Sequence, residues 1–367
     1  MKGADFLHEV DEILQKRKIV ITCGTGGVGK TTLSSAMAIR AAMLGKKTVV
    51  ITIDPAKRLK TALGLTELGD EPTDLTPRLR KLVPGGLKGS LEAIVPDTRR
   101  TFERFVRSIA PNPASADRLM KNPIFEIFAR EFSGSNEYMA LERLHELHTK
   151  GGYDCIVLDT PPSRNTLGFL RAPRILAQFF EEKLIRWLVT PANRLVAGGM
   201  RKALGILERL TGEGFMTHLL AFATSLFEMQ DGFTRNLREV TRLMESSETG
   251  FVMVTGPTPE TVPEARHFIE EARAHRLQFD GVLMNRTLGY LSDRGSAAEV
   301  RSPEARKLME ALVARERKVL EELEAAGIEL KARLPELARD VHSVEDLFHV
   351  AMAFDADRGR DALVEHR

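Results

Sequence analysis

The chain has 367 residues, of which 43 % are hydrophobic and 28 % charged, a composition typical of folded globular proteins. Its formal net charge of +2 gives no electrostatic reason to expect binding to nucleic acid or to a membrane surface. The longest apolar stretch, around 216–226, is too short to span a bilayer, and acidic residues interrupt the N-terminal segment where a signal peptide would be apolar, so we expect a cytoplasmic protein.

A helical pattern over residues 4–16 precedes the most informative segment, which begins with an apolar strand pattern at Lys18–Cys23. Gly24 opens the sequence Gly-Thr-Gly-Gly-Val-Gly-Lys-Thr, a complete phosphate-binding loop of the form G-x-x-x-x-G-K-[ST]. A helical pattern follows it, so strand, loop and helix come in the order that this motif requires. Backbone N–H groups would face a polyphosphate, Lys30 would reach its β- and γ-phosphates, and the Thr31 hydroxyl would bind Mg²⁺.

Two aspartates follow the next strong strand patterns. Lys47–Ile53 is followed by Asp54 and a proline, and Tyr153–Leu158 is followed by Asp159 and two prolines. Ligands bind at the carboxyl ends of strands in open α/β sheets, so we expect Asp159 to hold Mg²⁺ through a bound water and Asp54 to orient the attacking water. The alternative for each is an ordinary turn or helix-capping aspartate. A weaker strand pattern at Leu91–Val95 suggests the edge of the sheet.

The remaining patterns alternate between helices and strands, which predicts an α/β fold with a mostly parallel sheet covered by helices on both faces. We expect one P-loop NTPase domain over 1–367, with an inserted α-helical subdomain at 171–247 and a further helical insertion at about 98–150. The later strands are predicted at Phe251–Thr255, Gly281–Asn285 and Ile328–Arg333, and the later helices at 260–275, 303–326 and 341–354.

Three motifs together resemble the ArsA family of ATPases, which includes the arsenite-pump ATPase and the guided-entry ATPase that delivers tail-anchored membrane proteins. They are Gly-x-Gly-Gly-Val-Gly-Lys-Thr-Thr, Ile-Asp-Pro-Ala, and Leu-Asp-Thr-Pro-Pro-Ser-Arg-Asn-Thr-Leu-Gly-Phe-Leu. The resemblance extends from about residue 15 to residue 350, and the third motif separates this family from the related MinD and ParA proteins. It implies a dimeric switch that hydrolyses ATP to ADP and phosphate with Mg²⁺.

The resemblance also implies roles for individual positions. Asp54 and Lys30 would be catalytic, and Thr31 and Asp159 would hold Mg²⁺. The residues implied to bind the nucleotide are Gly26, Gly27, Val28, Gly29, Lys30, Thr31 and Thr32 at the phosphates, and Asn285, Pro335, Glu336 and Leu337 at the adenine. Without the resemblance, Asn285 would be read as a turn former at a strand end.

The chain departs from the family at Thr25, where the class normally has a lysine that reaches the partner subunit's phosphates. Three alternatives stay open: slow hydrolysis, a heterodimer with a related ATPase that has the lysine, or substitution by Lys57 or Arg58. The second departure is the absence of a cysteine cluster. Cys23 and Cys155 both lie in predicted strands and there is no C-x-x-C, so we do not expect arsenite transport or a zinc site between subunits.

The stretch 215–229 is rich in Phe, Met and Leu. Such side chains either form the core of the helical subdomain or offer a dimer contact or a groove for a hydrophobic protein client. A membrane-associated partner would fit the same surface. Two other functions remain open: an ATP-binding regulatory or assembly subunit with little hydrolysis of its own, which Thr25 favours, and a positioning protein similar to MinD or ParA.

Overall fold

A computed structural model describes residues 9–52, 69–126, 129, 136–160, 214–288, 302–337 and 340–354. The chain divides into two compact units. The sheet unit consists of Met1–Pro96, Leu144–Gly168 and Leu243–Arg367, and the helical unit consists of Asp97–Arg143 and Phe169–Arg242. The residue ranges of the helical unit overlap the two insertions predicted at about 98–150 and at 171–247. Of these, 171–213 lies outside the described residues.

Among the described residues, the sheet unit is built on an eight-stranded sheet in the order β3-β4-β2-β5-β1-β6-β7-β8. Every described pairing is parallel except that of β3 with β4, so the predicted mostly parallel α/β sheet is confirmed. The strands are β1 (Ile19–Cys23), β2 (Lys47–Thr52), β3 (Thr73–Asp74), β4 (Ser90–Ile94), β5 (Cys155–Asp159), β6 (Thr249–Thr255), β7 (Phe279–Thr287) and β8 (Leu330–Pro335).

The weak strand pattern at Leu91–Val95 corresponds to β4, but β4 is not the outermost strand. The two-residue strand β3 pairs with it antiparallel, with Thr73 opposite Ala93, and forms that edge of the sheet. A strand of two residues is too short for a hydrophobic period to appear in the sequence, which is why β3 was not predicted.

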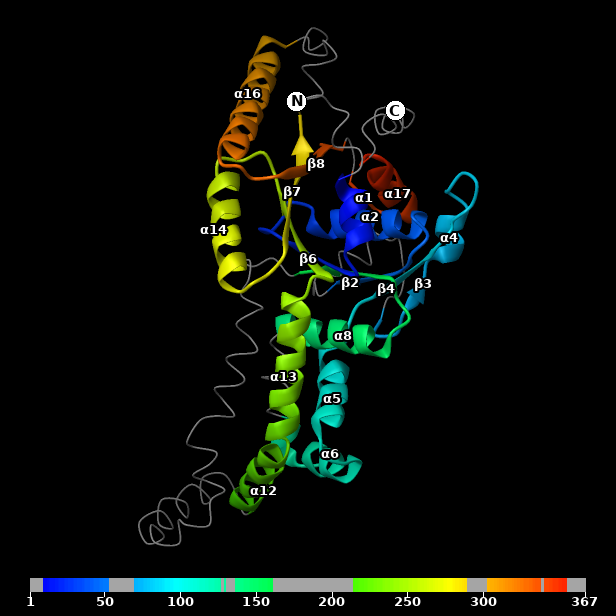
Figure 1. Ribbon diagram of the computed structural model, residues 1–367, viewed down its shortest axis with the longest axis vertical. Coiled ribbons are helices and arrows are strands. Elements are labelled where there is room, and N and C mark those ends of the chain that lie inside the picture. The colour runs from blue at the N-terminus through cyan, green and yellow to red at the C-terminus, as the bar shows by residue number, and fades with distance from the viewer. Residues whose placement is uncertain are drawn as a thin grey trace. The chain divides into compact units, whose positions relative to one another are not determined.

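Helices cover both faces of this sheet (Figure 1). On one face, apolar side chains of α1 (Glu9–Lys16), α2 (Lys30–Met43), α4 (Thr76–Arg80) and α17 (Val344–Met352) pack with alternate strand residues such as Val20, Val50 and Val157. On the other side of β6 to β8 lie α14 (Thr261–Ala274) and α16 (Pro303–Ala325) (Figure 1). Because parallel strands are buried on both faces, their sequences are apolar throughout rather than alternating.

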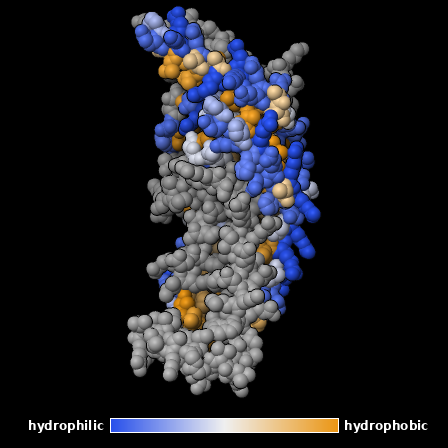
Figure 2. Space-filling model, turned by 90° about the vertical axis from the view of Figure 1, so that its left-hand side faces the viewer, coloured by the Kyte–Doolittle hydropathy of each residue, from blue (hydrophilic) through white to orange (hydrophobic). Residues whose placement is uncertain are grey.

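The surface over α14 and α16 is mostly hydrophilic, with smaller apolar patches (Figure 2). Leu308 on α16 is 63 % exposed, and α16 buries its second half more than its first, through Glu316, Val319 and Leu323. Within the described ranges, none of the helices combines the length and the apolar character that crossing a membrane requires.

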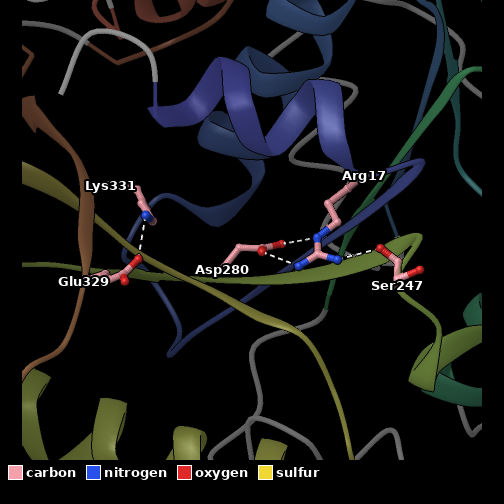
Figure 3. A network of polar contacts seen from close by, with 5 residues as sticks. All are labelled: Arg17, Ser247, Asp280, Glu329 and Lys331. Atoms are coloured by element: carbon pink, nitrogen blue, oxygen red, sulfur yellow. Dashed lines mark hydrogen bonds and ion pairs between the residues drawn. The ribbon is translucent and has the colours of Figure 1, made fainter. Parts of the chain in front are cut away.

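A buried polar network lies at the amino ends of the strands (Figure 3). The Arg17 guanidinium, just before β1, donates to both carboxylate oxygens of Asp280 on β7, at 2.8 Å from Nε and 2.6 Å from Nη2, and also to the Ser247 carbonyl oxygen before β6. Arg17 and Asp280 are 4 % and 9 % exposed. Beside them, the Lys331 ammonium pairs with Glu329 and Glu9. Arg17 therefore joins the segments before β1 and β6 to the start of β7, at the edge opposite the carboxyl ends of the strands, and the Lys331 pairs form a separate set of contacts at β8.

The helical unit has its own aromatic core. Phe102 and Phe105 of α5 pack against Phe125, Tyr138 and Phe233, with ring centroids 5.7 to 5.9 Å apart. The described helices of this unit are α5 (Thr98–Ile109), α6 (Pro113–Met120), α12 (Phe215–Glu228) and the larger parts of α8 (Asn136–Lys150) and α13 (Gln230–Glu245). The Asp97 side chain accepts from the Arg100 N–H and the Asn112 side chain from the Ser115 N–H, so sequence-local caps define where α5 and α6 begin.

Candidate functional site

The phosphate-binding loop connects β1 to α2 at the carboxyl edge of the sheet. Gly24 has a φ of +143°, and a Cβ at this position would lie 2.1 Å from the Val254 carbonyl oxygen of β6. Gly29 has a φ of +91° and immediately precedes α2, whose first helical residue is Lys30. Both positions require glycine because φ is positive there, and a side chain would also meet the β6 backbone at Gly24 and the Asn285 side chain at Gly29. The loop therefore leads into the N-terminus of α2, where N–H groups and the helix dipole favour an anion.

Lys30 lies over this loop and is almost fully buried. Its ammonium donates to the carbonyl oxygens of Gly24 and Thr25, at 2.8 and 2.9 Å. These contacts hold the positive charge beside the loop backbone, within the segment where the sequence predicts phosphates. Gly26 and Gly27 are exposed on the same loop, Val28 is half-buried, and Thr32 is half-buried in the first turn of α2.

Thr31 and Asp159 meet although 128 residues separate them in the sequence. The Thr31 hydroxyl donates to Asp159 Oδ2 at 2.6 Å, and the Thr52 hydroxyl at the end of β2 donates to the same oxygen at 2.7 Å. Asp159 ends β5 and is 1 % exposed. A hydroxyl and a carboxylate side by side are hard oxygen donors of the kind that Mg²⁺ prefers, so the predicted metal pair fits that ion. Thr52 lies outside the predicted motifs; its position at the end of the strand beside β5 is the signal that could have identified it.

Hydrogen bonds between small buried hydroxyl residues connect α2 to the strands that it covers. The Thr22 and Ser34 hydroxyl oxygens are 2.6 Å apart, and Ser34 also donates to the Lys30 carbonyl oxygen. Thr160 donates to the Thr22 carbonyl oxygen at 2.7 Å. Cys23, the next residue of β1, is fully buried, and burial raises the pKa of its thiol to about 12, partly offset by the nearby Lys30 charge. The thiol is therefore neutral at physiological pH and serves as a small packing group.

Asn285 also lies at this edge, close to the loop. Its carboxamide Nδ2 donates to the Val28 carbonyl oxygen at 3.0 Å, although 257 residues separate the two positions. The pairing of β7 with β8 shifts register between Met284 and Thr287, and Arg286 has a φ of +61°. This irregularity, a bulge at the end of β7, brings Asn285 to the loop.

The segment predicted to cover the adenine ends β8 beside this bulge. The Glu336 N–H donates to the Thr287 carbonyl oxygen at 3.0 Å, and the Glu336 carboxylate lies 3.7 Å from the Arg286 guanidinium. Pro335 is the last residue of β8, and Leu337 packs against the core below α2 and α17. The structure thus places Pro335 and Glu336 beside Thr287 and Arg286, and Asn285 of the same segment contacts the phosphate-binding loop.

Three predicted residues cannot be placed. Asp54, Lys57 and Arg58 lie outside the described residues, as do the prolines after Thr160. Thr25 is placed: it is half-buried in the loop, and its carbonyl oxygen accepts from Lys30. In the described ranges, His, Cys, Asp and Glu side chains form no group of three or more that could hold a metal ion.

The chain has a glycine-rich loop between the central parallel strand β1 and helix α2, and an aspartate at the end of β5, which lies beside β1 in the sheet. This arrangement defines a P-loop nucleotide-binding protein. The model of one P-loop family, described as "Anion-transporting ATPase", matches residues 17–351. The chain therefore belongs to the ArsA ATPase family.

Individual relatives agree with this assignment. The chain is 32 % identical to a "Putative arsenical pump-driving ATPase 2" of Aquifex aeolicus, over 43 % of this chain and 50 % of that protein. It is 24 % identical to a "Putative arsenical pump-driving ATPase" of Prosthecochloris vibrioformis, over 76 % and 63 %. It is 26 % identical to "ATPase get3" of Schizosaccharomyces japonicus, over 74 % and 75 %. The matches thus span from half to three quarters of the length of these relatives.

Proposed function

We propose that the chain is a Mg²⁺-dependent ATPase of the cytoplasm, which hydrolyses ATP to ADP and phosphate and acts as a dimeric switch. The observation that carries this proposal is the arrangement at the carboxyl edge of the sheet. Lys30 lies over a glycine loop at the start of α2, and the Thr31 hydroxyl is 2.6 Å from the Asp159 carboxylate. Family membership and relatives named as ATPases support the same activity.

The roles of the residues follow from their chemistry. The loop and Lys30 would bind the phosphates, and Thr31 with Asp159 would hold Mg²⁺, which neutralises charge on the β- and γ-phosphates when bound. Thr52 shares the Asp159 oxygen with Thr31 and so fixes the carboxylate's orientation. Asp54 is proposed to orient the attacking water on the motif match alone. Asn285, Pro335, Glu336 and Leu337 are proposed to contact the adenine.

Thr25 supports a second proposal, in which the chain binds ATP but turns it over slowly as a regulatory or assembly subunit. Threonine cannot supply the positive charge that a lysine at this position would bring to a partner subunit's phosphates. A heterodimer with a related ATPase that has the lysine would restore one complete site. Lys57 or Arg58, just after Asp54 in the sequence, would be the local replacement in a homodimer.

The helical unit is proposed to couple nucleotide state to a protein partner or hydrophobic client. On α12, Phe222 and Leu226 are buried in the unit's own aromatic core, whereas Leu220 and Phe227 are 43 % and 41 % exposed. The predicted Phe-, Met- and Leu-rich stretch therefore contributes to the core and still leaves large apolar side chains accessible. This supports a binding surface without identifying what binds.

Specific activity in a Mg-ATP turnover assay is expected to rise with protein concentration if a homodimer completes the site. The reason is that a site shared by two subunits exists only in the associated state. The assay measures phosphate release by the purified chain over a dilution series, with binding of Mg-ATP measured in parallel. Binding with flat, near-zero turnover would contradict the homodimeric ATPase and favour the slow subunit or a mixed pair. Failure to bind Mg-ATP would overturn both proposals.

Arsenite is expected to leave that turnover unchanged, because the chain cannot offer it two thiolates. The sequence contains two cysteines, at opposite ends of adjacent parallel strands: Cys23 ends β1, and Cys155 begins β5 beside the position of Lys18. Five residues of strand place them about 16 Å apart. Burial raises the pKa of each thiol to about 12. Stimulation of phosphate release by arsenite would contradict this expectation.

A further inference from the structure

Asn285 contacts the phosphate-binding loop directly, which recognition of the adenine base would not require. Asn285 Nδ2 donates to the Val28 carbonyl oxygen at 3.0 Å, and a Cβ on Gly29 would lie only 2.3 Å from that nitrogen. The carboxamide therefore occupies the space that a side chain at Gly29 would fill. It also binds the peptide group that links Val28 to Gly29, the residue directly before Lys30.

The bulge that carries Asn285 is itself held by a buried carboxylate. Glu316 of α16 is 2 % exposed, and one of its oxygens accepts from the backbone N–H of Leu288, just after β7. Its other oxygen accepts from Arg333 Nη2 of β8 at 2.8 Å. A carboxylate buried this deeply is stabilised by such charge-assisted hydrogen bonds, and through them Glu316 joins α16 to β8 and to the residue just after β7.

Two further hydrogen bonds close the bulge against β8. The Thr287 hydroxyl donates to the Leu334 carbonyl oxygen at 3.0 Å, and the Glu336 N–H donates to the Thr287 carbonyl oxygen. Arg286 in between has a φ of +61°, a conformation that non-glycine residues adopt only when their surroundings fix it. Asn285 thus projects from a segment that is fixed on several sides, and a fixed segment can position a loop.

We propose that Asn285 is a positioning residue for the phosphate-binding loop, acting through the Val28 carbonyl, and that Glu316 holds Asn285 in place for this role. The inference rests on the proposed nucleotide-binding function. It differs from that proposal in assigning Asn285 a role at the phosphates, which does not depend on the presence of adenine.

A ligand that has phosphates but no base separates the two roles. Binding of Mg-ATP and of Mg-tripolyphosphate to the full chain is measured by titration calorimetry for the wild type, Asn285→Ala and Glu316→Gln. Asn285→Ala is expected to weaken both ligands by a similar factor, about three- to tenfold, the effect of one lost hydrogen bond. Glu316→Gln retains the Asn285 side chain but sets a neutral amide against Arg333, which weakens the support of the segment that carries Asn285. It is expected to weaken both ligands equally, by a smaller factor.

Two control variants remove a carboxamide and a carboxylate at positions away from the phosphate-binding loop. Asn122→Ala deletes a carboxamide that also donates to a backbone carbonyl, that of His218, at 2.8 Å in the helical unit. Glu322→Gln removes an exposed charge from α16, paired with Lys318 at 3.8 Å. Neither should alter binding of either ligand. Circular dichroism and thermal unfolding establish that each variant is folded, and Glu316→Gln provides the test if Asn285→Ala is not.

Several outcomes would overturn the inference. If Asn285→Ala weakens ATP and leaves tripolyphosphate unchanged, Asn285 contacts only the base, and the proposed nucleotide-binding function stands. If it changes neither ligand, or if the wild type binds ATP without measurable tripolyphosphate binding, the positioning role is also wrong. If the wild type binds neither ligand, the proposed function fails, and this inference fails with it.

Discussion

Lys30→Met is expected to lower Mg-ATP turnover about 100- to 1,000-fold, the effect typical of removing one preorganised group that stabilises transition-state charge. Methionine keeps the apolar stem of the side chain and removes the ammonium. In the structure this ammonium lies 2.8 and 2.9 Å from the Gly24 and Thr25 carbonyl oxygens, at the loop where phosphates are proposed to bind. Phosphate release measures the effect, and calorimetric titration with Mg-ATP measures it when the wild type turns over slowly.

The control for this variant is Lys150→Met, which removes an ammonium on the surface. Lys150 is 68 % exposed and pairs with Glu146 one turn earlier in α8, so its replacement should leave ATP binding and turnover unchanged. Thermal unfolding of Lys30→Met shows whether the loop tolerates the loss of two hydrogen bonds. A folded Lys30→Met protein that binds Mg-ATP within about threefold of the wild type would mean that Lys30 does not face the phosphates.

The sequence was most informative where the residues of the site are neighbours in the chain. The strand before Gly24, the loop to Thr31 and the helix after it are neighbours in the chain, so each could be read from residue types and spacing. Asp159 could be read because a strand pattern ends there, and the parallel arrangement then placed it at the same edge as the loop. Alternation of strand and helix patterns was sufficient to predict a mostly parallel sheet with helices on both faces.

Contacts between distant segments could not be read in this way. Thr52 and Asp159 are 107 residues apart, and Asn285 and Val28 are 257 apart, so the register of strands rather than any local pattern brings each pair together. The segment after the register shift in β7 donates from the Leu288 N–H to Glu316, and nothing in the sequence of α16 indicates this contact. Strand β3 is two residues long, which is too short to show the alternation of apolar and polar residues that indicates a strand. These features depend on tertiary packing, which a single sequence does not encode locally.

Arg17→Met is expected to lower the free energy of unfolding by about 3–5 kcal/mol, the range for breaking a buried ion pair by removing one partner. Arg17 donates through Nε and Nη2 to both Asp280 oxygens, and it also binds the Ser247 carbonyl oxygen (Figure 3). Methionine would leave the Asp280 carboxylate buried at 9 % exposure without its guanidinium. Urea denaturation followed by circular dichroism measures the loss.

A second substitution tests whether the uncompensated charge causes that loss. The double variant Arg17→Met/Asp280→Asn removes the carboxylate charge and should recover part of the stability, since a neutral amide is less costly to bury unpaired. Lys318→Met is the control in the same unit: its ion pair with Glu322 is exposed, and its loss should change stability by less than about 1 kcal/mol. A loss from Arg17→Met no larger than that of Lys318→Met would contradict the prediction.

Nucleotide binding by the folded Arg17→Met protein is expected to match the wild type. Arg17 precedes β1, whereas the phosphate-binding loop follows Cys23 at the other end of that strand, about 16 Å away along five residues. Stability and ligand binding should therefore separate in this variant, in contrast to Lys30→Met, which should lose binding while remaining folded. A folded Arg17→Met protein with weakened Mg-ATP binding would instead mean that the amino edge of β1 sets the geometry of the loop at its carboxyl end.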